Sequence, residues 1–194
     1  WLDRAFLDGR VPEARLTYAG EVRRFPFRDG GGEFKVTARL EGLRVHYQDG
    51  WTDLEDAHGT ATFLNQGFTA TLERARLNGL AASEGEVGLP DYRDAVLSVR
   101  ARTRGDVRDA LTFVQRAPIG PKLGGWFMRV QGRGALDARV TLELPFRRMP
   151  DRLVEVDARI ERASARLPSL DDDARIAAAA FRLRNRDVDV SAVS

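Results

Sequence analysis

Few residues in this 194-residue chain have the types and spacing that enzymatic chemistry requires. The histidines His46 and His58 fall at positions predicted to point outward from strands, and no carboxylate stands at the spacing of a zinc site or a catalytic triad. The run Asp171-Asp172-Asp173 could attract a cation, but it lacks the glycine and the distal glutamate of a calcium loop. The sequence therefore predicts surface histidines, a solvated turn and no metal site.

A glycine-rich stretch and two tryptophans are the remaining candidates. Gly120-Pro-Lys-Leu-Gly-Gly125 contains a lysine, yet its order is not that of a phosphate-binding loop, and we interpret it as a flexible connection or a flap. Trp51 and Trp126 could contact lipid headgroups, although a buried anchor with a satisfied N–H is the commoner role. Since no catalytic pair stands out, the sequence predicts a protein that is not an enzyme and needs no cofactor.

The composition excludes several classes of protein and of binding site. The chain has 31 basic and 29 acidic residues, and the arginines alternate with acids, whereas nucleic-acid surfaces cluster their basic residues. Cysteine is absent, which excludes disulfides and thiolate metal sites. No run reaches the eighteen apolar residues of a membrane span, and the chain opens at Trp1 without an initiator Met or a signal sequence. We expect a soluble internal fragment that does not bind nucleic acid.

Most of the chain alternates apolar and polar residues, as a strand does when one face is dry and the other wet. The clearest run is FKVTARLEGLRVHY, residues 34–47, in which the apolar positions take one step of three at Glu41-Gly42. A bulge within one bent strand fits this step better than a hairpin, because the matching stretch at 154–167 has Glu161-Arg162 there. The other alternating runs are Leu16 to Val22, Ala57 to Leu64, Phe68 to Arg74, Val96 to Arg102, Ala135 to Phe146, Ala174 to Leu183 and Val188 to Ala192.

Turn residues separate these runs and favour antiparallel neighbours. Asp49-Gly50, Asn65-Gln-Gly67 and Asn78-Gly79 are hairpin signals, and Pro90-Asp91 interrupts pairing. One segment has helical spacing instead: Val107, Ala110, Leu111 and Val114 follow a capping residue, Asp106, and Pro118 closes the pattern. A second, short helix is predicted over Trp1 to Leu7.

The chain also repeats itself. Positions 36–47 and 156–167 keep identical Val, Ala, Arg and Glu residues at an offset of 120, and their inward positions are all apolar. The match extends upstream to Pro26-Phe27 against Pro145-Phe146, and downstream to Phe68-Thr69-Ala70 against Val188-Asp189-Val190. This pattern predicts one repeat unit over residues 1–134, including the helix near 106–116, and part of a second over 135–194 that continues the first.

A sheet with one apolar face needs another layer or a ligand to cover that face. One central helix is too little to cover about ten strands, so two interpretations stay open at this point. Two sheets could close into a β-sandwich that acts as a scaffold or docking module, or one sheet could curl into a trough that meets an apolar ligand.

Several short segments of the sequence also resemble those of a known family. They are Gly9-Arg10-Val11-Pro12-Glu13, Phe25-Pro26-Phe27-Arg28-Asp29-Gly30-Gly31-Gly32 with Phe34-Lys35-Val36, Leu43-Arg44-Val45-His46-Tyr47 with Trp51-Thr52-Asp53-Leu54, and Asn78-Gly79. They are similar to the AsmA-like superfamily of Gram-negative bacteria, in particular its YhdP branch, which is related to TamB. The resemblance covers nearly the whole chain and implies a mainly β fold, in which curled antiparallel repeats form an elongated groove with one or two short helices.

The resemblance also implies a function. Members are anchored in the inner membrane and project a β-groove through the periplasm, along which phospholipid moves to the outer membrane. The expected partners are therefore phospholipid or another acyl lipid, and other envelope proteins, with membrane contact through other parts of the parent protein. The residues expected to line the groove are Phe34, Val36, Ala38, Leu40, Leu43, Val45, Tyr47, Phe68, Leu97, Val99, Val140, Leu142, Val154, Val156, Ala158 and Ile160, followed in the second copy by Ala163, Ala165 and Leu167.

Overall fold

The computed structural model describes residues 6–166, 174–185 and 187–192, which form one antiparallel sheet of eleven strands and one α-helix. The strands are β1 (Phe6–Arg10), β2 (Ala14–Ala19), β3 (Glu33–Val45), β4 (Leu54–Leu64), β5 (Gly67–Leu77), β6 (Leu80–Leu89), β7 (Val96–Asp106), β8 (Gln131–Pro145), β9 (Leu153–Arg166), β10 (Ala174–Arg184) and β11 (Asp187–Ala192). The helix is α2 (Val107–Arg116), and single 3₁₀ turns are η1 (Val22–Arg24), η2 (Gly120–Leu123), η3 (Phe127–Arg129) and η4 (Met149–Asp151).

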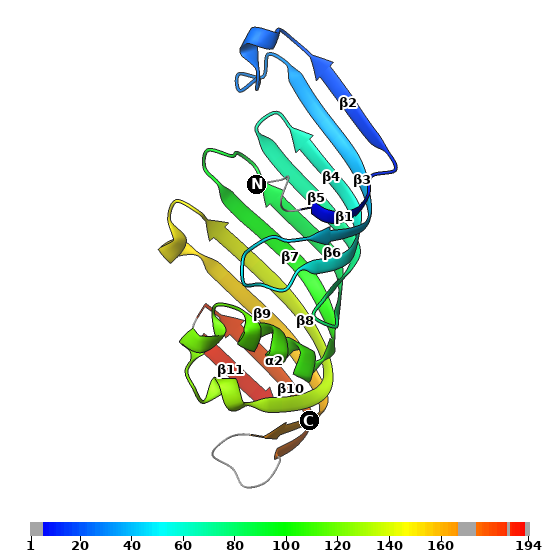
Figure 1. The fold of residues 1–194 in the computed structure, drawn as a ribbon. Coiled ribbons are helices and arrows are strands. Elements are labelled where there is room, and N and C mark those ends of the chain that lie inside the picture. The colour runs from blue at the N-terminus through cyan, green and yellow to red at the C-terminus, as the bar shows by residue number, and fades with distance from the viewer. Residues whose placement is uncertain (1–5, 167–173, 186, 193–194) are drawn as a thin grey trace.

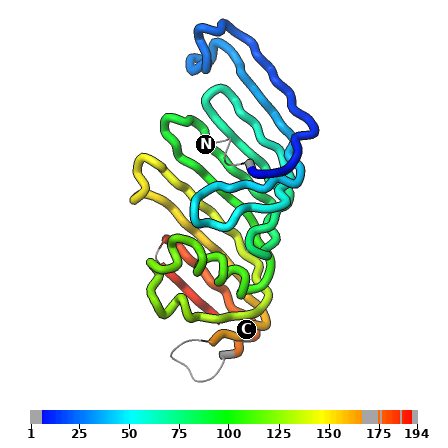
Figure 2. The backbone as a smooth tube through the Cα atoms, viewed as in Figure 1, coloured from blue at the N-terminus to red at the C-terminus, as the bar shows by residue number. Residues whose placement is uncertain are grey.

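The strands follow one another along the molecule. Each strand from β3 to β11 pairs with the next, and β1 and β2 both pair with the free side of β3. Figure 1 shows this ladder running from β2 at one end to β10 and β11 near the other, and Figure 2 shows the same path as a tube. The sheet is curled but open, because its path ends at β1 and β11 without closing. The expected curled antiparallel fold is confirmed, and the β-sandwich is wrong, because all the described strands belong to one sheet.

A line of bulges crosses the sheet. Residues with positive φ stand inside the strands at Gly42, Asp56, Glu84, Gly134 and Arg162. The pairing register shifts beside each of the five, in the β3–β4, β4–β5, β6–β7 and β8–β9 pairs. A bulge bends its strand and increases its twist, so aligned bulges bend the sheet as a whole. The predicted bulge at Glu41-Gly42 is confirmed, and β9 likewise continues through Glu161-Arg162 as one strand.

The buried core of the sheet lies along this bend. Leu43, Ala57, Ala75 and Ala82 form a buried cluster. Leu40, Val45, Leu54 and Leu72 pack against it. Each of β3, β4 and β5 carries its apolar residues through the bend with a step of three, as in Leu40 to Leu43 and Leu72 to Ala75. The bulge therefore keeps apolar side chains on one face on both sides of the bend.

The helix begins and ends where the sequence predicts. The Asp106 carboxylate accepts a hydrogen bond from the Arg108 backbone N–H at 2.8 Å, which satisfies one of the free amides of the first turn. Helix α2 packs on β8, where a Cβ at Gly132 would lie 3.1 Å from both Leu111 and Val107. Glycine at position 132 therefore lets the helix approach the strand closely.

Two groups of three strands pair in the same register. Val36 pairs with Phe63 and Phe63 with Phe68, and 120 positions later Val156 pairs with Leu183 and Leu183 with Val188. Asn65 and Asn185, also 120 positions apart, both have positive φ. The Asn65 side chain accepts from the Phe34 N–H at 2.8 Å, and the Asn185 side chain accepts from the Val154 N–H at 2.9 Å.

Other details differ from the sequence predictions. Strand β2 ends at Ala19, because Gly20 has a φ of 124° and the chain then enters η1. Strand β6 was not predicted, since its alanines, serine and glycines have weak strand propensity. Phe6 and Leu7 lie in β1 and not in a helix, and residues 1–5 lie outside the described part.

The upstream Pro-Phe match is not equivalent in structure. Pro26 lies in the loop before β3, and Phe27 beside it is 1% exposed. Pro145 is the last residue of β8, and Phe146 is 54% exposed. The shared Pro-Phe letters therefore belong to two different local structures.

Candidate functional site

One face of the sheet is apolar from strand to strand. The pairing registers place eight residues in a single row from β2 to β9, and each of them is apolar. The row consists of Ala14, Ala38, Ala61, Ala70, Val87, Val99, Leu142 and Val154. Residues directly opposite each other in a pair of strands project to the same side, so these side chains form a continuous surface, called here the apolar face.

The other face is polar along an equally continuous row. From β3 to β11 it consists of Arg39, Thr60, Thr71, Glu86, Arg100, Thr141, Glu155, Arg184 and Asp187. Opposite charges meet across this face, as in Arg184 with Glu155 at 3.0 Å and Arg182 with Asp157 at 2.7 Å. This face is suited to water, so the two faces of the sheet have opposite solvent preferences.

The apolar face is incompletely covered by the described part of the protein. Thirteen of the sixteen residues expected to line a groove are half-buried, Leu43 and Ala158 are buried, and Tyr47 is 36% exposed. Apart from Phe27, no large side chain of the described residues is fully buried. Large residues in a closed core would be almost completely buried, so this exposure is what a face without a second layer should show.

The structure places most of the expected lining residues on this one face. Val36 continues through Phe63 and Phe68 to Leu89, and Val140 pairs with Val156 and Ala158 with Ala138. Tyr47 is the exception, because it follows the end of β3 and its ring lies 6.4 Å from that of Trp51. Burial raises the pKa of Tyr47 to about 12, which keeps its hydroxyl neutral. Leu167 lies outside the described residues.

Sequence reasoning missed several residues of the same face. Ala61, Ala70 and Val87 complete the apolar row, and Phe63 and Leu89 lie beside it. The turns could have identified these residues. A two-residue connection at Asn65-Gln66 fixes which residue of β5 lies opposite each residue of β4. The inward side of one strand therefore determines the inward side of the next.

An aromatic contact joins the first strands to the helix. The segment 46–53 connects β3 to β4, and the Trp51 ring lies 5.5 Å from the Phe113 ring of α2. A Cβ at Gly50 would lie 2.9 Å from Pro118, so the backbone also approaches the end of the helix. The Asn78 side chain donates to the Asp109 carbonyl of α2 at 2.8 Å. These contacts hold α2 beside the connections of β3–β4 and β5–β6.

Both histidines have carboxylate partners, which corrects the expectation from spacing alone. His46 Nδ1 lies 2.8 Å from Asp53 Oδ1, its Nε2 lies 2.9 Å from Asp49 Oδ1, and His58 Nε2 lies 2.9 Å from Asp56 Oδ1. The hydrogen bonds to Asp49 and Asp53 raise the pKa of His46 above its ordinary value. Turn and bulge conformations bring these partners together, and spacing along an ideal strand cannot show this.

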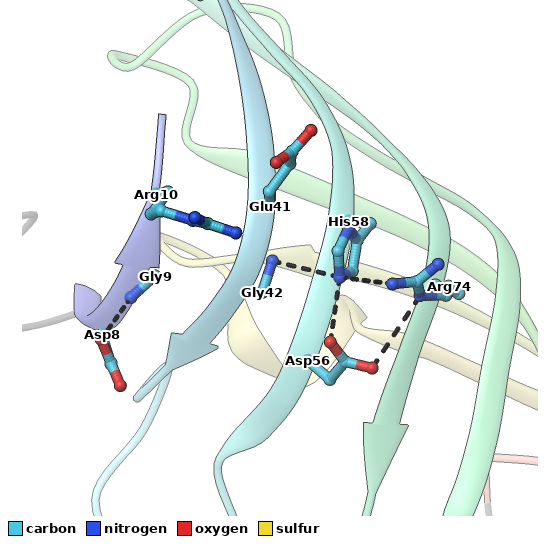
Figure 3. Close-up of a pocket in the computed structure, with 8 residues that line it drawn as sticks. All are labelled: Asp8, Gly9, Arg10, Glu41, Gly42, Asp56, His58 and Arg74. Carbon is cyan, nitrogen blue, oxygen red and sulfur yellow. Dashed lines mark hydrogen bonds and ion pairs between the residues drawn. The ribbon is translucent and has the colours of Figure 1, made fainter. Parts of the chain in front are cut away.

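A shallow cavity lies over the bulges of β3 and β4 (Figure 3). Its volume is 410 Å³, and three of its charged residues, Asp56, His58 and Arg74, contact one another. Asp56 contacts His58 at 2.9 Å and lies 3.9 Å from Arg74. Among the described residues there is no cluster of ligands that could hold a metal ion, and Asp171–Asp173 lie outside them.

The strongest ion pair on the polar face stabilises two neighbouring strands. Arg102 of β7 donates two hydrogen bonds to Asp137 of β8, at 2.8 and 2.6 Å, and Arg104 donates a third at 3.0 Å. These bonds hold the pKa of Asp137 well below its ordinary value and raise that of Arg102. A carboxylate held in this way does not exchange protons near neutral pH, so it has a structural role.

Comparisons with known proteins identify relatives of this chain. The model of the YhdP protein family matches residues 1–194. Over 145 residues the chain is 26% identical to the "Intermembrane phospholipid transporter YhdP" of Escherichia coli (strain K12), an alignment that covers 75% of this chain and 12% of that protein. No solved structure matches. The described part of the chain has no helix with the length and hydropathy of a membrane span. Because the family model covers every residue, the chain belongs to the YhdP family.

Proposed function

We propose that the apolar face of this chain shields acyl chains and conducts phospholipid through the periplasm between the inner and outer membranes. The observation that carries the proposal is the unbroken apolar row from Ala14 to Val154, with a fully polar row on the opposite face. The matched relative is a phospholipid transporter by its name, and the chain corresponds to 12% of its length. That phospholipid also moves along this chain, as a part of the longer transporter, belongs to our proposal.

The energetics explain why such a face is useful. Each methylene exposed to water costs about 0.8 kcal/mol, so two acyl chains with about thirty methylenes cost about 25 kcal/mol. An apolar protein face that covers the acyl chains removes most of this cost while the polar headgroup stays in water. The row consists of aliphatic side chains without hydrogen-bonding groups, so it has no polar group that would hold a lipid at one position.

The repeat gives this surface its length. We propose that residues 1–134 form one unit and 135–194 part of a second, supported by the shared registers of β3–β5 and β9–β11. The boundary falls within β8, so both units contribute to one sheet. The second unit places small residues at Ala163 and Ala165, where the first has Leu43 and Val45, which leaves more room above the sheet.

In this proposal the lipid is the partner, and no chemical step is required of the chain. Other envelope proteins and both membranes would be contacted through further parts of the parent protein, which we place in the periplasm with an anchor in the inner membrane. The competing function is a scaffold that docks envelope proteins without conducting lipid.

The experiment is native mass spectrometry of the chain purified from bacteria, combined with uptake of a fluorescent fatty acid. We expect mass additions that correspond to phospholipid, and saturable uptake of the probe. A chain that carries no phospholipid and takes up no probe would leave the scaffold as the better account.

A further inference from the structure

The bulges divide the apolar face into two parts that differ in burial. One part lies on the side where β7 leads into α2, and its leucines Leu43 and Leu80 are each 5% exposed. Leu80 belongs to the apolar face because it stands two positions before Ala82 of the buried cluster. The other part, where Val87 and Leu142 are only half-buried, extends to the edge formed by the connections 20–32, 65–66, 90–95 and 146–152. We call the first the covered part and the second the open part.

Helix α2 lies on the covered part. Residues of β3 after the bulge stay on the apolar face, because Val45 packs against the buried cluster. The corresponding residue of β9 is Ala165, which pairs with Gly132 of β8. A Cβ at Gly132 would project to the same side as the Ala165 side chain. It would lie 3.1 Å from both Val107 and Leu111, so these side chains of α2 rest on the apolar side of β8.

Contacts with other segments hold the helix in this position. The Trp51 ring of the β3–β4 connection lies 5.5 Å from the Phe113 ring. Gln115 Nε2 donates to the carbonyls of Phe127 and Val130 at 3.0 and 2.9 Å. Figure 1 shows α2 beside β7 and β8, and the helix contacts both strands. These contacts fix α2 over the covered part.

The open part is long enough for an acyl chain. In β8 it runs from Leu136, next to the bulge at Gly134, to Leu144 near the end of the strand. At about 3.4 Å per residue, this stretch is about 27 Å long. Each leaflet of a bilayer supplies half of a hydrocarbon core about 30 Å thick, so an acyl chain needs about 15 Å. A chain laid along the strands therefore fits within the open part.

We propose that α2 limits the depth of the lipid path, so that acyl chains occupy the open part of the apolar face and stop at the bulges. This inference rests on the proposed function and adds which part of the face contacts lipid. Val107 and Leu111 act as positioning residues, because they fill the space over Gly132 that the end of an acyl chain would otherwise occupy.

The test maps where an acyl chain lies on the intact protein chain. The probe is a palmitic acid analogue with a photoreactive diazirine at its terminal carbon, and mass spectrometry of peptides locates its adducts. We expect about tenfold more adducts on the open part than on the covered part, because a diazirine labels only atoms that it contacts. The informative residues are Val87 and Leu142 in the open part, and Leu43, Leu80 and Gly132 in the covered part. An excess of unlabelled palmitic acid should abolish the adducts.

The variant Val107→Ala/Leu111→Ala removes the side chains that lie over Gly132. Adducts at Gly132 and Ala165 should then rise about fivefold, because truncation leaves an apolar space that the end of the probe can enter. Leu111→Ala alone replaces the double variant if the latter does not fold. The matched control, Arg108→Ala/Arg116→Ala, shortens two exposed side chains of the same helix and should give the wild-type map. Circular dichroism confirms folding of each variant.

Equal labelling of the two parts in wild type would overturn the inference. An unchanged map in the folded Leu111→Ala variant would also overturn it, as would the same rise in the control. In each of these cases, adducts that palmitic acid abolishes would still support the proposed function. Absence of such adducts from wild type would overturn the proposed function together with the inference, so the two failures are distinguishable.

Discussion

At the scale of single residues, two asparagines in the same environment show how the hairpins are fixed. Asn65 has a φ of 51°, its side chain accepts from the Phe34 N–H at 2.8 Å, and its own N–H donates to the Phe34 carbonyl at 2.8 Å. Asn185 makes the same pair of bonds with Val154. Asparagine suits the position because it tolerates the left-handed conformation and supplies an acceptor.

We therefore expect Asn65→Ala to lower the free energy of unfolding by about 2 kcal/mol, through loss of one part-buried hydrogen bond and the cost of positive φ for alanine. Asn65→Gly should cost about 1 kcal/mol, because glycine loses the hydrogen bond but adopts the conformation freely. Urea denaturation measures both. Equal costs for the two variants would show that the backbone conformation contributes little.

His46 should make the stability of the fold depend on pH. Its pKa is raised because the protonated ring donates to Asp49 and Asp53, whereas the neutral ring can donate only once. The stabilisation is complete below the ordinary pKa of a histidine, and it is lost as pH rises through the raised pKa of the folded state. Asp53, whose pKa is lowered, stays ionised throughout that window.

His46→Ala should therefore lower the melting temperature more at about pH 5.5 than at about pH 9. Asp49→Asn removes the partner with the largest effect on the His46 pKa, so it should reduce this difference between the two pH values. Thermal melts followed by circular dichroism provide the measurement. An effect of His46→Ala that is independent of pH would contradict the assignment.

At the scale of elements, the bulges are the feature on which the curl depends. Gly42 has a φ of 62°, and a Cβ there would meet nothing within 4 Å, so only the backbone conformation restricts the residue. Arg162 has the same conformation 120 positions later, with a φ of 51°. A residue other than glycine is therefore compatible with this bulge.

Gly42→Asn should change the free energy of unfolding by no more than about 0.5 kcal/mol, because asparagine accepts positive φ. Gly42→Val should cost about 2 kcal/mol, since a β-branched residue at positive φ is strained. Chemical denaturation tests both variants. If valine is tolerated as well as asparagine, the strand must be able to straighten without loss, and the bulge does not define the bend.

The element scale also shows where sequence patterns are sufficient. The step of three at Glu41-Gly42 identified a bulge, and the capping residue Asp106 identified the start of α2. Strand β6 was missed, because Ala82, Ser83, Gly85 and Gly88 have weak strand propensity and form a strand through pairing with β5 and β7. Pairing with its two neighbours therefore makes β6 a strand, although its local propensity is weak.

At the scale of the whole molecule, the opposite preferences of the two faces lead to a paired prediction. Val36 and Thr37 are neighbours on β3, both are half-buried, and they project to opposite faces. Because Val36 is only partly covered, Val36→Asp should cost about 1 kcal/mol of stability, roughly half the value of a fully buried valine. The same substitution should abolish uptake of the fluorescent fatty acid.

Thr37→Asp places the same charge on the polar face, so both folding and uptake should stay close to wild type. Uptake titrations and thermal melts on the two variants give the comparison. Uptake that survives Val36→Asp in a folded chain would mean that acyl chains bind elsewhere. Complete unfolding by Val36→Asp would indicate a closed core instead of an open face.

The amino-acid sequence alone was enough to predict the period-two strands, the helix after Asp106 and the bulge at Gly42, because each depends on neighbours within a few positions, and similar residues recur at an offset of 120. That all the described strands share one open sheet, and that Asp49 and Asp53 reach His46, depends on the three-dimensional fold. The fold also places α2 on the apolar side of β8. Alternation shows that a strand has a dry face but not what covers it, since covering depends on contacts between distant segments.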